Sequence, residues 1–244
     1  MAPLFEELDY RPTPIGALSL RRRRDPALDI DVFEIKLGEE YLMSSLFTAS
    51  EVALAELGLA ELGLAELAGG GLDIVVGGLG LGYTAQAVLA SDAVASLIVV
   101  ETLDAVIDWH ESGLLPLGPQ LCGDARCRFV AGDFFALAAA PAGFDPDAPA
   151  RRFDAVLVDI DHSPEFWLDP ANAAFYEAGG LRAMMAHLKP GGVFGLWSNE
   201  LPDAGFTARL AAVFASAHAA PVTFRHPVQD SAFTQTVYLA RAAA

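Results

Sequence analysis

The sequence has little positive charge, few cysteines and no long apolar run. Only 15 of its 244 residues are basic, against 32 acidic residues, and the formal net charge is −17. Nucleic acid is a poor partner for such a chain, because phosphate binding needs an electropositive surface. An acidic cleft suits a cationic small molecule, although the acidity can also serve solubility alone. The charge therefore argues against a nucleic-acid partner and leaves a cationic ligand open.

The scarcity of cysteine and of apolar runs limits the protein class further. Cys122 and Cys127 are the only cysteines, and their spacing matches no common zinc pattern. We expect free thiols in a reducing compartment and no metal site. No apolar run approaches the roughly 18 residues of a membrane helix, and the N-terminus has no basic export segment. The sequence predicts a cytoplasmic protein without a membrane partner.

The most informative stretch, residues 73–89, has the pattern of a strand, a glycine turn and a helix. The apolar run 74–76 is interrupted by Gly77, Gly78, Gly80 and Gly82. In a parallel α/β sheet, such a turn lets a nucleotide lie against backbone N–H groups at the start of the helix. Taken alone, the pattern fits a tight loop equally well, so its context has to decide.

Three later apolar runs each end on a carboxylate, at Glu101, Asp133 and Asp159. Glu101 follows the glycines by about 20 residues, where an acid accepts hydrogen bonds from ribose hydroxyls. A single acid at the end of a strand can simply cap the next helix. Three of them in register with a glycine turn favour a nucleoside pocket at the carboxyl edge of the sheet.

The chain divides at residue 47 into two parts of different character. Residues 1–47 contain alternating apolar and polar positions and predict a small N-terminal β-strand region. Its basic run, Arg21 to Arg24, is interpreted as the exposed end of a hairpin rather than a phosphate site, because it is isolated in an acidic chain. Residues 48–244 predict a Rossmann-like, nucleoside-binding catalytic domain.

The larger part has the pattern of an α/β fold. A capping box from Thr48 to Glu51 predicts a helix that ends near Gly58, followed by a short broken helix. Beyond Asp73, strands alternate with helical stretches, which predicts a mostly parallel sheet with crossover helices. Residues 223–226 and 234–240 predict an antiparallel C-terminal hairpin at the edge of the sheet.

The order of these motifs resembles the class I S-adenosylmethionine-dependent methyltransferase fold. Within that fold, the chain is most similar to the spermidine synthase (aminopropyltransferase) family. The similarity rests on the Gly77-Gly78 doublet, the small β unit, and an acid pair, Asp159 and Asp161, after the fourth strand. Lys-Pro-Gly-Gly at residues 189–192 and the glycine turn are shared with many methyltransferases, so these two motifs specify only the fold.

The resemblance implies roles for individual residues. The glycines would approach the methionine part of a nucleoside co-substrate, Glu101 would hold the ribose, and Asp133 would accept from the adenine amine. The implied co-substrate is S-adenosylmethionine or its decarboxylated form, with no metal, and a homodimer is the natural expectation. The implied co-substrate-binding set is Gly77, Gly78, Gly80, Gly82, Glu101, Asp133 and Phe134.

The candidate catalytic set is Asp159, Asp161 and His162. Asp159 matches the family's catalytic acid, which orients the attacking amine and receives its proton. A base is needed because an ammonium has no lone pair with which to attack. His162 is a candidate base or hydrogen-bond donor, with a surface histidine as the alternative. Trp167 is a candidate for stacking on a cation or for packing over the core.

The resemblance implies transfer of an aminopropyl group from decarboxylated S-adenosylmethionine to a polyamine-type amine. Two alternatives stay open. The family's glycine turn carries an acid that helps to select the decarboxylated co-substrate, whereas this turn reads Gly77-Gly-Leu-Gly-Leu-Gly82. Methyl transfer from intact S-adenosylmethionine to a small molecule is therefore one alternative. A non-catalytic protein that binds a nucleoside or polyamine is the other.

Overall fold

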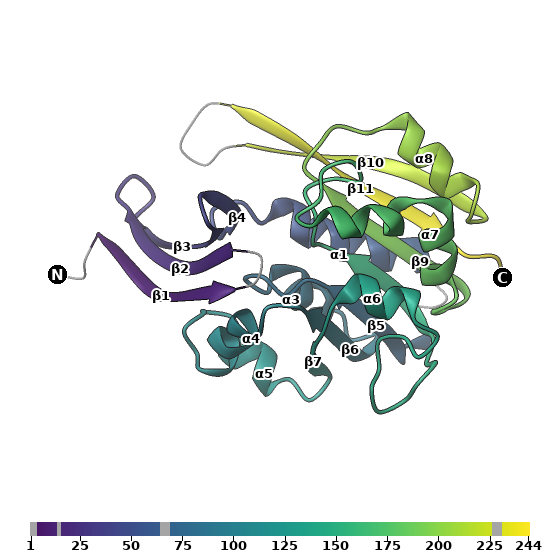
Figure 1. Ribbon diagram of the computed structural model, residues 1–244, viewed down its shortest axis with the longest axis horizontal. Helices are drawn as coiled ribbons and strands as arrows, with labels where there is room; N and C mark the ends of the chain where they lie inside the picture. The colour runs from purple at the N-terminus through teal and green to yellow at the C-terminus, as the bar shows by residue number, and fades with distance from the viewer. Residues whose placement is uncertain (1–3, 14–15, 64–68, 226–230) are drawn as a thin grey trace.

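The computed structural model of the protein describes residues 4–13, 16–63, 69–225 and 231–244. A small antiparallel sheet lies beside a larger α/β unit (Figure 1). The small sheet has the strand order β1-β2-β3-β4. Its strands are β1 (Phe5–Thr13), β2 (Gly16–Asp25), β3 (Ile30–Leu37) and β4 (Glu40–Ser44).

The large sheet has the order β10-β11-β9-β8-β5-β6-β7. Strands β5 to β9 run parallel, and β10 and β11 form an antiparallel hairpin on the edge next to β9. The strand order reverses at β5, where ligands of α/β proteins bind beyond the carboxyl ends of the strands. The bounds are β5 (Leu72–Gly77), β6 (Val94–Glu101), β7 (Cys127–Ala131), β8 (Phe153–Val158), β9 (Leu188–Ser198), β10 (Ser216–Arg225) and β11 (Ala232–Arg241).

Helices cover both faces of the large sheet. Side chains alternate across a strand, so Ile74 and Val76 join one core and Val75 joins the other. The first core contains α1 (Ala49–Leu62), α3 (Tyr83–Leu89), α4 (Asp104–Glu111) and α5 (Gly118–Gly123). The second contains α6 (Phe134–Ala139), η1 (Pro170–Tyr176), α7 (Ala178–Met185) and α8 (Ala204–Ala211). The predicted fold class, a mostly parallel Rossmann-like sheet with an antiparallel hairpin and a small N-terminal β unit, is confirmed.

Helix α1 is longer than the sequence predicts. It continues through Gly58 to Leu62, where the prediction ended it near Gly58. A Cβ at Gly58 would lie 2.5 Å from Leu157 Cδ2 of β8. The glycine therefore lets the helix pack closely on the sheet, which offsets its cost to helix propensity. The broken helix predicted next falls partly on residues 64–68, and the first predicted strand of the hairpin, 223–226, ends on residue 226. Residues 64–68 and residue 226 lie outside the described residues.

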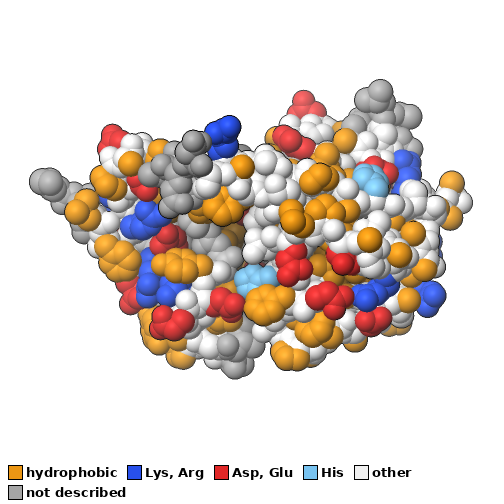
Figure 2. All heavy atoms as spheres, turned by 90° about the horizontal axis from the view of Figure 1, so that it is seen from above, with side chains coloured by type: hydrophobic (Ala, Val, Ile, Leu, Met, Phe, Trp, Pro, Cys, Tyr) orange, Lys and Arg blue, Asp and Glu red, His pale blue; other side chains and the backbone are white. Residues whose placement is uncertain are grey.

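The basic run of residues 21–24 ends β2 just before the turn into β3, as the hairpin prediction requires, but its side chains are half-buried rather than exposed. Acids lie opposite Arg21, Arg22 and Arg24 on the neighbouring strands, whereas Arg23 lies opposite Phe5 and Val32. Arg22 contacts Glu6 at 2.6 Å and Arg23 contacts Glu34 at 2.8 Å. Figure 2 shows basic and acidic side chains side by side over this sheet. Cross-strand charge pairs thus replace the exposed patch that the sequence alone suggested.

No helix among the described residues is both long and apolar enough to span a bilayer.

Candidate active site

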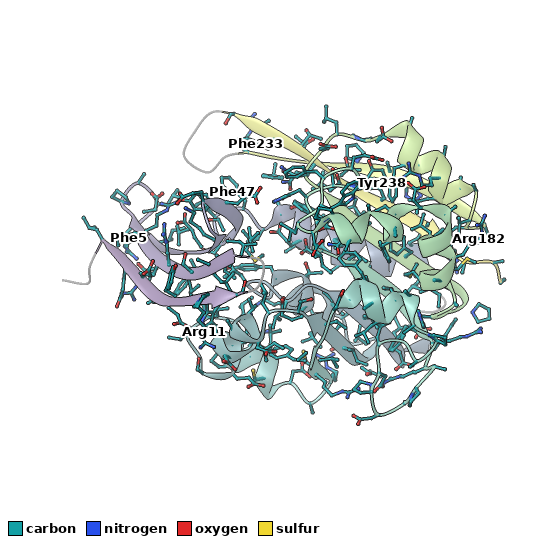
Figure 3. The ribbon with its side chains drawn as sticks, in the orientation of Figure 1. Phe5, Arg11, Phe47, Arg182, Phe233 and Tyr238 are labelled. Carbon is teal, nitrogen blue, oxygen red and sulfur yellow. The ribbon has the colours of Figure 1, made fainter. Side chains whose placement is uncertain are left out.

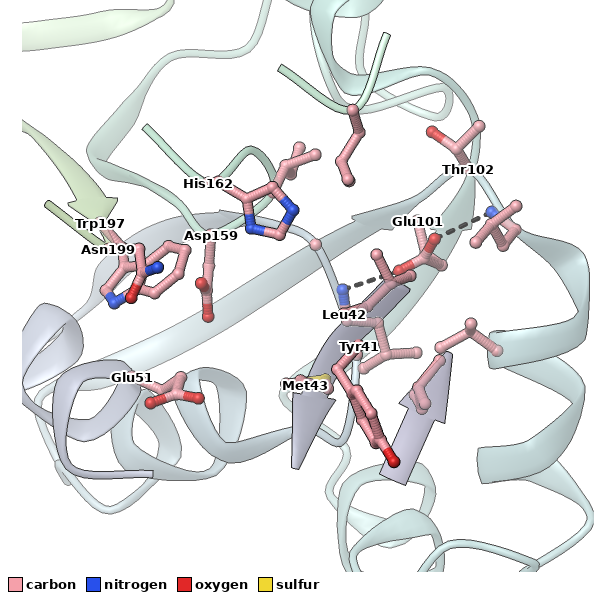
Figure 4. A pocket seen from close by; sticks show the side chains of 18 of the residues that line it. Tyr41, Leu42, Met43, Glu51, Glu101, Thr102, Asp159, His162, Trp197 and Asn199 are labelled. Carbon is pink, nitrogen blue, oxygen red and sulfur yellow. Dashed lines mark hydrogen bonds between the residues drawn. The ribbon is translucent and has the colours of Figure 1, made fainter. Parts of the chain in front are cut away.

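A cavity of about 590 Å³ lies between the small sheet and the carboxyl edge of the large sheet. Its walls come from segments that are distant in the sequence, namely β4, the start of α1, the glycine turn and the ends of β6, β8 and β9. Its size is that of an ordinary small-molecule site. Residues that line it include Tyr41, Leu42, Met43, Glu51, Glu101, Asp159 and Trp197 (Figure 4).

The glycine turn forms one wall through Gly78 and Gly80. Both have positive φ, +93° and +45°, which disfavours other residues. A Cβ at Gly78 would lie 2.2 Å from the Asp159 carbonyl oxygen, and one at Gly80 would lie 2.3 Å from Met43 Sδ. These contacts leave bare backbone facing the cavity, as a bound nucleoside requires.

The two remaining glycines of the predicted set do not line the cavity. A Cβ at Gly77 would meet the Phe134 ring at 2.6 Å, and one at Gly82 would meet Leu121 Cδ1 at 2.7 Å. Gly77 and Gly82 therefore serve the packing behind the turn. Phe134 is likewise buried there, at 1% exposure, and its neighbour Phe135 lines the cavity instead. The sequence assignment was wrong by one residue, because the first turn of α6 directs Phe134 into the core.

Glu101 ends β6 and faces the cavity. Its two oxygens accept from the backbone N–H groups of Leu79, at 3.0 Å, and Leu103, at 2.9 Å. Burial raises the pKa of Glu101, and these N–H groups lower it. The carboxylate is thus fixed in orientation at the wall of the cavity. This geometry fits the ribose-binding role that the sequence predicts.

Asp133 also lines the cavity and caps α6. Its Oδ1 accepts from Phe135 N at 2.9 Å and from Ala136 N at 3.2 Å. The cap uses only Oδ1, so Asp133 can cap the helix and also accept a hydrogen bond from a ligand through Oδ2. It lies on the same side of the cavity as Glu101, at the end of the adjacent strand.

Asp159 follows β8 and faces Glu51, the third residue of α1, across the cavity (Figure 4). Asp159 Oδ2 accepts from Thr84 Oγ1 at 2.7 Å, and Glu51 Oε2 accepts from Ser50 Oγ at 2.8 Å. Burial raises the pKa of Asp159 to about 6. Burial and then the charge of Asp159 raise the pKa of Glu51 to about 7. Within the described residues, neither carboxyl has an ion-pair partner.

The sequence interpretation missed the role of Glu51. It assigned Glu51 to a capping box with Thr48, but the Thr48 side chain makes no capping hydrogen bond. Instead the first turn of α1 directs Glu51 into the cavity at 8% exposure. An acid three residues after a threonine can complete a capping box or face a cavity. Only the folded structure, which places Glu51 opposite Asp159, shows that it faces the cavity.

Asp161, which the sequence placed in the catalytic set, does not line the cavity. It is 1% exposed and accepts from Leu168 N and Tyr176 OH, both at 2.8 Å, and from Asn172 Nδ2 at 3.1 Å. Burial raises the pKa of Asp161, and these donors lower it. The side chain ties the segment after β8 to η1 and so supports the loop that carries His162.

His162 lines the cavity near its opening. Its ring stacks on Phe166 with 5.1 Å between centroids, and Nε2 lies 3.6 Å from Glu40 Oε1 of β4. Trp167 packs against the second core, and its Nε1 donates to Pro164 O at 2.8 Å. The packing interpretation of Trp167 is therefore the correct one.

Strands β9 and β11 form a further wall of the cavity. Trp197 Nε1 donates to Gln235 Oε1 at 3.3 Å, and Gln235 Nε2 donates to Asn199 Oδ1 at 2.8 Å. All three line the cavity. Phe47 continues this wall beside Phe233, with 6.1 Å between ring centroids (Figure 3). No periodicity or motif marks Gln235, because the hairpin brings it to the cavity only in the folded chain.

Comparison with solved structures places this geometry among known folds. A spermidine synthase in complex with the transition-state analogue AdoDATO matches with a TM-score of 0.69 and 17% identity, over 96% of this chain and 73% of that one. The spermidine synthase of Thermotoga maritima matches with a TM-score of 0.67 and 16% identity, over 96% and 72%. The fold is the spermidine synthase-like form of the class I methyltransferase fold. No protein-family model matches the sequence.

A methyltransferase shares a smaller part of the fold. Human methyltransferase-like protein 13, in complex with SAH, matches with a TM-score of 0.56 and 23% identity, over 79% of this chain and 82% of that one. The two spermidine synthases therefore cover more of this chain than the methyltransferase does, 96% against 79%. At these identities the likeness establishes the fold, and the reaction has to be argued from the cavity itself.

Proposed function

We propose that the protein transfers an aminopropyl group from decarboxylated S-adenosylmethionine to a polyamine-type amine. The observation that carries the proposal is the Glu51 and Asp159 pair, two buried carboxyls that share one cavity. Two such groups without a cationic side chain between them attract a cation, because each raises the cost of ionising the other. An ammonium group bound between them removes that cost.

The opposite side of the cavity suits the nucleoside part of such a co-substrate. Gly78 and Gly80 present backbone there, and Glu101 and Asp133 present carboxylate oxygens. These oxygens can accept hydrogen bonds from ribose hydroxyls and from an adenine amine. A co-substrate held there supplies a sulfonium leaving group.

The carboxyl pair would carry out the proton chemistry. Asp159, with a pKa of about 6, is ionised over most molecules at neutral pH and accepts a proton from the bound ammonium. The freed nitrogen lone pair forms a bond to the carbon beside the sulfur while the carbon–sulfur bond breaks, and the sulfur leaves as a neutral thioether. Glu51 holds the acceptor in line, which supplies much of the remaining rate through orientation. In this proposal His162 borders the acceptor side, and Asp161 supports its loop.

Methyl transfer from intact S-adenosylmethionine is the second candidate. The observation that favours it is the contact of Met43 with the glycine turn. The Met43 thioether occupies the space into which a side chain at position 80 would extend. The turn therefore has no acid at position 80 that would repel the carboxylate of intact S-adenosylmethionine.

Calorimetric titration separates these functions. The protein would be titrated with S-adenosylmethionine and with its decarboxylated form, each with and without putrescine. Tighter binding of the decarboxylated form, with release of methylthioadenosine when putrescine is present, is the expected result. Preference for intact S-adenosylmethionine would replace the proposal with methyl transfer. Binding without turnover of any amine would indicate a non-catalytic protein, and no binding of either form would refute the nucleoside site.

The homodimer and the cytoplasmic location stay predictions of the resemblance and of the composition. Light scattering on the purified protein tests the homodimer.

A further inference from the structure

A buried histidine outside the cavity contacts the glycine turn from behind. His110, in α4, is 1% exposed, and its Nε2 lies 2.9 Å from the carbonyl oxygen of Gly80. A Cβ at Gly82 would lie 3.0 Å from His110 Cε1. The imidazole thus fills the space directly under the turn that lines the cavity.

The surroundings of His110 determine its protonation. A carbonyl can only accept, so Nε2 carries the hydrogen. Nδ1 is buried and has no hydrogen-bond partner among the described residues. The ring packs edge-on against Phe129 with 5.8 Å between centroids, and burial lowers the pKa of His110. The side chain is therefore a neutral imidazole with one donor, which points at Gly80.

Gly80 connects this donor to the cavity. On one side its carbonyl accepts from His110. On the other side its N–H faces the Glu101 carboxylate and lowers the pKa of that group. A rotation of the peptide after Gly80 would leave a buried carbonyl unsatisfied, at a cost comparable to a lost hydrogen bond. The histidine thereby fixes both the backbone that faces the cavity and the carboxylate beside it.

The turn is held from the cavity side as well. The N–H of Leu81 donates to Met43 Sδ at 2.9 Å, and Met43 comes from β4 of the small sheet. A thioether is a weak acceptor, so this contact holds the turn less firmly than the imidazole does.

We infer that His110 is a positioning residue for the nucleoside site, acting through the Gly80 carbonyl on the glycine turn and Glu101. This inference rests on the proposed function only for the choice of ligand. Without the donor, the turn samples other conformations, and the nucleoside binds more weakly. No proton is transferred by His110, which has no contact with the cavity.

A second buried histidine provides a matched control. His187 is 4% exposed and its Nε2 lies 3.1 Å from the Ala138 carbonyl oxygen, at the end of α6. Burial lowers its pKa also. It makes the same kind of bond in the same kind of surroundings, but it does not touch the glycine turn.

The test compares methylthioadenosine affinity in His110→Leu, His110→Asn and His110→Gln with the same three changes at His187. Leu removes the donor, Asn is too short to reach Gly80, and Gln places its amide nitrogen near the position of Nε2. We expect Leu and Asn at position 110 to weaken binding about tenfold, the value of one hydrogen bond. Gln should restore most of the affinity, and the changes at His187 should lower stability without changing affinity.

Equal affinity in His110→Asn and His110→Gln, or equal losses at both histidines, would overturn the inference. Hydrogen exchange of the backbone N–H groups of residues 78–82 gives a second readout that needs no ligand. It should accelerate in His110→Asn and not in His187→Asn. If the wild-type protein binds no methylthioadenosine, the proposed function fails, while unchanged exchange in His110→Asn removes the positioning role itself.

Discussion

Acidic residues have opposite surroundings at the two ends of the parallel strands, which we call the amino edge and the carboxyl edge of the large sheet. At the amino edge, Asp73 and Asp154 contact Lys189 Nζ at 2.9 and 2.7 Å. Nearby, burial favours a higher pKa for Asp145, but hydrogen bonds from Arg151 and Arg128 lower it to about 2. At the carboxyl edge, Glu51 and Asp159 have raised pKa values and no ion-pair partner among the described residues.

This difference indicates which acids are structural and which are available to a ligand. An acid that is neutralised by a neighbouring cation stabilises the fold and has little left to offer a substrate. A buried acid without such a partner costs stability, so its retention points to a function. Charge alone does not distinguish the two groups, since each contains ordinary Asp or Glu residues at the ends of strands.

Substitutions at the two ends of β8 should give the largest difference in kcat. Asp159→Asn keeps the shape of the side chain and removes the base, so we expect kcat to fall by about a thousandfold. Calorimetry should show that methylthioadenosine still binds. Asp154→Asn, at the amino end of the same strand, breaks the contact with Lys189 and should leave kcat unchanged. Normal turnover by Asp159→Asn, measured as methylthioadenosine release, would remove the proposed mechanism.

Removing the second acid should affect the acceptor more than the nucleoside. Glu51→Gln loses one charge-assisted hydrogen bond to the amine, so the KM for the acceptor should rise about tenfold to a hundredfold. Glu56→Gln, an exposed position on the same helix, is the control. Steady-state kinetics with putrescine measure both variants. If the KM for the amine stays unchanged in Glu51→Gln, then Glu51 does not hold the acceptor.

The two edges should respond to pH with opposite signs. The pKa values of Glu51 and Asp159 are raised on folding, so their contribution to stability is present below about pH 4 and is lost as pH rises through 6 to 7. The lowered pKa of Asp145 stabilises above about pH 4, and this contribution is lost as pH falls through about 2.

Urea unfolding of a double variant, Glu51→Gln with Asp159→Asn, measures the carboxyl-edge contribution. Its free energy of unfolding should exceed that of the wild type by on the order of 1 to 3 kcal/mol at pH 8 and match it near pH 4. A double variant that is less stable than the wild type at pH 8 would show that the two acids are structural.

Loss of a cation at the amino edge should have the smallest effect. Lys189→Met removes the contacts with Asp73 and Asp154, but the lysine side chain is 37% exposed and water screens the pairs. We expect the free energy of unfolding to fall by about 1 kcal/mol or less, with methylthioadenosine affinity unchanged. Chemical denaturation and calorimetry measure these two quantities, and a loss of affinity would contradict the separation of the two edges.

The sequence by itself determined the fold class and the strand ends. The glycine turn and the acids at Glu101, Asp133 and Asp159 could be predicted, because each depends on neighbours in the chain and on the period of a strand. The same local rules predicted the C-terminal hairpin and the start of the helix at residue 49.

Only the tertiary structure decided which residues meet at the cavity. Phe135 replaces Phe134, and Asp161 supports a loop, because side-chain direction depends on what each segment packs against. Glu51 and Gln235 reach the cavity from elements distant in sequence, and His110 reaches the glycine turn from behind. Burial gives Glu51 and His110 their altered pKa values. Such long-range contacts leave no periodic trace in the chain, since they depend on packing between elements rather than on spacing within one.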